Sequence, residues 1–113
     1  MIRMLKIGSG SSVQMTRGDT AYLKINITND VTGMPYALQN TDTLTLTVKR
    51  YVADETPALQ KRVQGGDVFR ISAEDTQKLP CGVYLYDVQL DTALGDVFTV
   101  ICAARFELLQ EVT

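Results

Sequence analysis

The sequence predicts an all-β domain of about seven short antiparallel strands with one short helical connector, folded as a sandwich or a small barrel. Three observations support this. Thr, Val, Ile and Tyr fill the apolar runs, and these residues suit a pleated, half-buried surface. Apolar and polar residues alternate with the period of a strand. Clusters of Gly, Pro, Asn and Asp recur at short intervals and predict turns.

Length and composition indicate one globular domain with an N-terminal extension. The chain has 113 residues, of which 45% are hydrophobic and 21% are charged. The loosest stretch is the Gly-Ser run at residues 8–12. We therefore expect residues 1–12 to be an N-terminal arm and linker, and residues 13–113 to be the β-sandwich domain.

The charge balance excludes some partner classes. There are 11 basic and 13 acidic side chains, so the net charge is −2 and no general attraction to nucleic acid or anionic membranes is expected. No apolar run approaches the roughly 20 residues that span a bilayer. Arg3 and Lys6 interrupt the apolar start, which is therefore not a signal peptide. We expect synthesis in the cytoplasm.

The first strands are predicted from alternation. Residues 13–15 form a short candidate, and residues 21–28 place Leu23, Ile25 and Ile27 on one face. Polar residues occupy the other face, as in a strand with one solvated side.

The middle of the chain continues the pattern. Residues 43–51 repeat the alternation, residues 58–63 are charged and suit a protected edge strand, and residues 68–72 form another strand. Residues 72–79 are the helical connector, because Ser can cap the helix and acidic residues suit its first turn.

The last hairpin joins residues 84–90 to residues 98–108. Pairing Leu90 with Phe98 leaves residues 93–95 as a loop ending in Gly95, which supplies the left-handed conformation such loops need. The predicted core of the domain is Leu23, Ile25, Ile27, Leu44, Leu46, Val48, Phe69, Ile71, Tyr86, Val88, Val100, Cys102 and Phe106.

The two cysteines are not expected to form a disulfide. Extending the same register places Cys102 opposite Tyr86, five residues from Cys81, or roughly 16 Å along a strand. A disulfide needs Cα atoms within about 7 Å. Cys102 would face inward as a small hydrophobe, and Cys81 would lie in a turn that solvent can reach.

Catalytic chemistry is not indicated. The sequence has no His, no G-x-S-x-G elbow and no phosphate-binding loop followed by a helix. Asp87 and Asp91 lie on the outward face of a predicted strand, which favours a solvated surface over an acid–base pair. We therefore predict no enzyme activity, and no catalytic, cofactor-binding or metal-binding residue.

Several apolar side chains are candidates for protein contacts. The arm of residues 1–7 is too apolar for a free tail, so we predict that it pairs with another chain. The alternative is that it adds a first strand to its own sheet. Tyr84 and Tyr86 point inward, which leaves the other tyrosines, Tyr36 included, available for an interface. The chosen interaction candidates are Met4, Leu5, Ile7, Tyr22 and Tyr51.

Four stretches, residues 15–20, 30–38, 43–49 and 71–90, carry a resemblance to a known family. The last combines an acidic helical turn, a Leu-Pro-Cys-Gly stop and a Tyr-x-Tyr-Asp strand. In their order and spacing these features resemble the small immunoglobulin-like domain of bacteriophage and prophage baseplate or tail proteins, of the kind found at the N-terminus of the baseplate upper protein.

The resemblance implies an immunoglobulin-like β-sandwich and a virion structural role in a tail or baseplate. Its expected partners are other phage structural proteins or further copies of this chain. No small-molecule substrate or cofactor is implied, and the protein would be made in the bacterial cytoplasm and carried in the virion. The family's receptor-directed C-terminal region has no counterpart here, so we expect assembly rather than host recognition. A carbohydrate-binding module is the alternative, and it would need a row of exposed aromatic residues on one sheet face.

Overall fold

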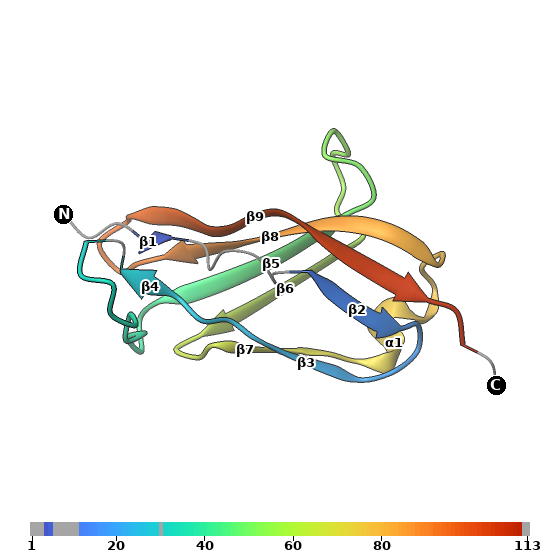
Figure 1. The fold of residues 1–113 in the computed structure, drawn as a ribbon, viewed down its shortest axis with the longest axis horizontal. Coiled ribbons are helices and arrows are strands. Elements are labelled where there is room, and N and C mark those ends of the chain that lie inside the picture. The colour runs from blue at the N-terminus through green and yellow to red at the C-terminus, as the bar shows by residue number, and fades with distance from the viewer. Residues whose placement is uncertain (1–3, 6–11, 30, 112–113) are drawn as a thin grey trace.

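The computed structural model describes residues 4–5, 12–29 and 31–111. These residues form nine β-strands and one short helix, so the all-β prediction is confirmed (Figure 1). The molecule is elongated, with extents of 48 × 26 × 25 Å.

The larger sheet has five strands. Its order is β2 (Val13–Thr16), β9 (Val97–Leu109), β8 (Gly82–Asp91), β5 (Thr43–Lys49) and β6 (Leu59–Gln64). The charged strand β6 lies at one edge, as predicted. Three of the four pairings are antiparallel, but β2 runs parallel to β9, so the expectation of antiparallel strands throughout is wrong there. These two strands lie far apart in the sequence, and no tight hairpin fixes their relative direction.

Two short ladders complete the fold. Strand β3 (Ala21–Lys24) pairs with β7 (Val68–Ile71), and β1 (Met4–Leu5) pairs with β4 (Thr28–Asn29), both antiparallel. The single strand expected at residues 21–28 is interrupted, because its middle bonds to loops. Ile25 donates its N–H to the Asp67 carbonyl at 2.7 Å.

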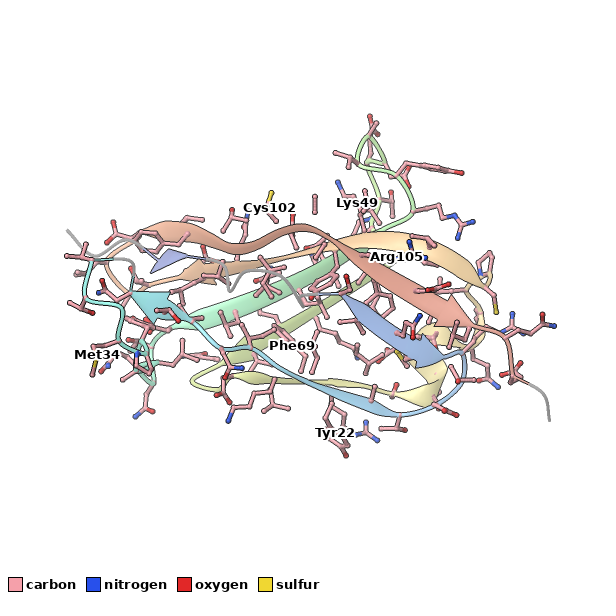
Figure 2. The ribbon with its side chains drawn as sticks, in the orientation of Figure 1. Tyr22, Met34, Lys49, Phe69, Cys102 and Arg105 are labelled. Atoms are coloured by element: carbon pink, nitrogen blue, oxygen red, sulfur yellow. The ribbon has the colours of Figure 1, made fainter. Side chains whose placement is uncertain are left out.

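The core lies between the β3–β7 ladder and one face of the five-stranded sheet, where Figure 2 shows Phe69. Leu23 is partly buried against this core. Of the predicted core residues, those confirmed as buried are Ile25, Ile27, Leu44, Leu46, Val48, Phe69, Ile71, Tyr86, Val88, Val100 and Phe106.

Cys102 is a correction, because it is exposed rather than buried. The hairpin begins in the predicted register, with Leu90 opposite Phe98 and Gly95 at a φ of 90°. Two register shifts follow, and Tyr86 pairs with Ala104 instead of Cys102. Each extra residue turns the following side chains over, so Cys102 points outward. Cys81 and Cys102 are not bonded to each other.

The predicted connector is helix α1 (Ala73–Gln77). The carboxylate of Asp75 accepts the Ser72 N–H at 2.8 Å and pairs with the Lys61 ammonium of β6 at 2.7 Å. After the helix, the hydroxyl of Tyr84 donates to the Pro80 carbonyl at 2.7 Å, which fixes the chain as it enters β8.

Candidate functional site

The outer face of the five-stranded sheet carries a grid of polar side chains. The alternation that buries one side of β5 and β8 turns their other side outward. Across these two strands, Thr45 pairs with Gln89 and Thr47 pairs with Asp87. The same register brings Asp91 beside the first residue of β5.

This face is hollowed into a groove of about 380 Å³. Val52, from the loop between β5 and β6, forms part of the lining at one end. Figure 1 shows this loop, drawn in green, projecting away from the sheet, and Figure 2 shows Lys49 and Cys102 on the same side of the molecule. The groove is lined by Thr45, Thr47, Lys49, Val52, Gln60, Arg62, Leu85, Tyr86, Asp87, Gln89, Asp91, Cys102 and Ala103.

Hydrogen bonds between β6 and β5 order one half of the groove. The Arg62 Nε donates to Thr45 Oγ1 at 3.3 Å, and the Gln60 amide donates to Thr47 Oγ1 at 3.1 Å. Thr45 is only 7% exposed although it lies on the outward face. Long side chains of the edge strand β6 therefore cover the threonines. The charged side chains of this edge also hinder its pairing with a strand of another chain.

Asp87 lies in the middle of the groove and is half-buried. Burial raises the pKa of its carboxyl group, and the nearby Lys49 ammonium offsets only part of this effect. A partly desolvated carboxylate attracts hydrogen-bond donors, so Asp87 is a candidate acceptor for a ligand or partner at this face.

On the side opposite to β6, the groove is bounded by a bulge in β9. Cys102 and Ala103 stand between the pairs Val88–Ile101 and Tyr86–Ala104, where β8 supplies only Asp87. Ala103 has a φ of 49°, the left-handed region that L-residues adopt at a cost of roughly 1–2 kcal/mol. The bulge places two small side chains at the rim, which leaves the groove open.

Substitution of Ala103 should test the strain in this bulge. Glycine adopts the left-handed region freely, so Ala103→Gly should leave the free energy of unfolding unchanged or raise it by up to about 1 kcal/mol. A β-branched residue is strongly disfavoured there, and Ala103→Val should lower it by about 1–2 kcal/mol. Urea unfolding of both variants measures this. Equal stability of the two variants would contradict the bulge conformation.

The predicted tyrosine candidates do not lie together. Tyr22 is 69% exposed on β3, on the opposite layer (Figure 2), and Tyr51 is 66% exposed on the β5–β6 loop beside the groove. The Tyr36 hydroxyl is used internally, donating to Asp42 at 2.7 Å. The row of exposed aromatic residues that the carbohydrate alternative requires is therefore not found among the residues the structure describes.

The arm candidates are only partly described. Met4 pairs with Asn29 and Leu5 with Thr28 of the same chain, which is the alternative in which the arm joins its own sheet. Ile7 lies outside the described residues. Pairing of the arm with another chain remains a prediction.

The groove itself was missed by sequence reasoning, which assigned Asp87 and Asp91 to a flat solvated face. One signal was present in the sequence. Residues 100–104 are consecutive small or apolar residues and break the alternation of the last strand. Such a break is typical of a bulge, and bulges are common beside functional sites.

Comparisons with known proteins give no family for this chain. No protein-family model matches the sequence, and no curated protein matches it. Within the described residues, no cluster of three or more His, Cys, Asp or Glu side chains is arranged to hold a metal ion. Across the same part of the chain, no helix is long and apolar enough to cross a membrane.

Proposed function

We propose that the chain is a non-catalytic structural module of a bacteriophage or prophage virion, acting in tail or baseplate assembly. The observation that carries the proposal is the order of features in residues 71–90, a strand, a short acidic helix, a Leu-Pro-Cys-Gly stop and a Tyr-x-Tyr-Asp strand. In this stretch, which carries most of the resemblance to phage domains, β7, α1 and β8 follow one another and Tyr84 bonds back to Pro80.

The fold we infer is an immunoglobulin-like sandwich. Its support is the strand order β2-β9-β8-β5-β6 facing a β3–β7 ladder. A tyrosine near the start of the penultimate strand, whose hydroxyl bonds to backbone a few residues upstream, is a hallmark of such sandwiches. Tyr84 and Pro80 have this arrangement. Because this fold serves many functions, the role must be argued from the surface.

The groove favours binding over catalysis. Asp87 and Asp91 are four residues apart on one strand, so their Cα atoms are separated by about 13 Å. Side chains of a strand stand roughly perpendicular to the sheet, so the two carboxyl groups are not expected to reach the roughly 5–9.5 Å that separates paired catalytic carboxyl groups in glycoside hydrolysis. The remaining lining is a mixture of hydroxyls, amides, opposite charges and aliphatic side chains, which resembles the polar rim of a surface that contacts another protein.

The test is the composition of particles from a strain that encodes the chain. Particles released after prophage induction are purified by density gradient and analysed by mass spectrometry and immunogold electron microscopy. We expect the chain in the particles, with label at the tail end. Its absence from tailed particles, while other tail proteins are detected, would overturn the proposal.

A further inference from the structure

We propose that the outer face of the five-stranded sheet binds the same face of a second copy of this chain, around a twofold axis lying across the strands. The inference names a partner for the assembly role proposed above and rests on that role. It is carried by the arrangement of charges and exposed apolar side chains along this face.

Lys49 and Asp91 carry opposite charges at opposite ends of the face, whereas the charge of Arg105 is balanced by Glu107, which it contacts at 3.3 Å. Lys49 on β5 and Arg105 on β9 lie on either side of β8 in one row, because both are in register with Leu85. Asp91 on β8 lies in the row at the other end, paired with Val97. The two rows are six residues apart along β8, or about 20 Å.

This layout is self-complementary for only one choice of axis in the plane of the face. An axis across the strands places Asp91 of one copy between Lys49 and Arg105 of the other, and the symmetry repeats the contact. An axis along the strands instead stacks the basic rows on each other and the acidic rows on each other. Opposed charges favour the first arrangement and penalise the second.

Exposed apolar side chains also lie at both ends of the face, where the axis across the strands brings them together. Tyr51 and Val52 are 66% and 69% exposed on the loop that follows the basic row, and this loop projects from the sheet (Figure 1). Leu94 and Val97 are 90% and 58% exposed on the hairpin beside the acidic row. The axis across the strands brings the loop of one copy over the hairpin of the other, so apolar side chains that are otherwise solvated cover each other.

The centre of the face is compatible with this contact. The middle of the groove lies between the row of Asp87 and the row of Gln89, where the axis passes. Asp87 of one copy then lies across from the partner's Gln89, whose amide can donate to the half-buried carboxylate. Bridging waters complete a polar centre of this kind. The patch is small, so we expect a dissociation constant of about 10–100 µM.

A charge-swap experiment tests the arrangement by sedimentation velocity of the full chain, from about 1 µM to about 1 mM. The wild type should form dimers. Lys49→Glu and Asp91→Lys should each weaken self-association about 100-fold, because each creates two like-charge contacts between positions 49 and 91. Mixing the two variants should restore dimers, since both contacts between positions 49 and 91 are then attractive in the heterodimer.

The control is Lys24→Glu, a charge reversal at an exposed position on the opposite layer, which should leave dimerisation unchanged. Thermal unfolding establishes that each variant is folded. A wild type that is monomeric at all concentrations overturns the proposal, as does a dimer that survives both reversals or a mixture that stays monomeric. The particle analysis described above tests the virion role separately. If the chain is found in virions but is monomeric in solution, only the dimer proposal is overturned. If it dimerises in solution but is absent from virions, only the virion role is overturned.

Discussion

Phe106→Ala is expected to lower the free energy of unfolding by about 3–5 kcal/mol. Phe106 is 1% exposed in the second half of β9, and its ring packs edge-on against Tyr86 with centroids 6.0 Å apart and planes at 75°. The substitution removes the buried area, leaves a cavity and breaks an aromatic pair worth about 0.5–1.5 kcal/mol. This is a large share of the roughly 5–15 kcal/mol that stabilises a domain.

Urea unfolding followed by circular dichroism measures the effect. The matched control is Arg105→Ala on the adjacent position of the same strand, where the side chain points to solvent and its bond to Glu107 is a surface ion pair of 3.3 Å. It should change the free energy of unfolding by less than about 0.5 kcal/mol. A loss below about 1 kcal/mol for Phe106→Ala would show that this side chain is not a core residue.

The core could be predicted wherever a strand has strict alternation. In β5, β7 and β8 each second residue is apolar, and Leu46, Phe69 and Val88 are fully buried as the pattern requires. A period of two fixes the buried face once one residue is assigned to it. The turn at Gly95 follows from local chemistry as well, because its φ of 90° suits glycine.

The last strand shows where local rules are insufficient. The predicted register holds at Leu90 and Phe98 but not beyond the bulges, so Cys102 changes faces while Phe106 remains buried. The error at Cys102 arises because one extra residue inverts the alternation, whereas two extra residues restore it. A bulge leaves only a weak trace in a single sequence.

The candidate site could not be predicted because it depends on contacts between distant segments. The groove needs the β5–β6 loop at one end and the β9 bulge at its rim, and these meet only when the sheet forms. The parallel pairing of β2 with β9 is non-local in the same way. Sequence identified Asp87 and Asp91 as outward residues, but not that Asp87 would be half-buried.

Asp42→Ala should lower the free energy of unfolding by about 2–4 kcal/mol. The residue is only 3% exposed, and its carboxylate accepts the Tyr36 hydroxyl at 2.7 Å and the Gln39 N–H at 2.9 Å. Hydrogen bonds to a charged group are each worth about 1.5–3 kcal/mol, and the substitution leaves both donors without an acceptor. This network orders the long loop that leads into β5. Tyr36→Phe, which removes only one bond, should cost less.

Alkaline titration supplies a readout specific to this network. Burial and, next, the hydrogen bond to Asp42 raise the pKa of Tyr36 from 10.0 to about 12. Because the folded state holds this proton more tightly than the unfolded state, the stabilisation is complete below pH 10 and is lost as the pH rises toward about 12. Tyrosinate absorbance should show the late step in the wild type, an earlier step in Asp42→Ala and none for this residue in Tyr36→Phe. An unchanged late step in Asp42→Ala, or a loss of stability below about 0.5 kcal/mol, would contradict the role assigned to Asp42.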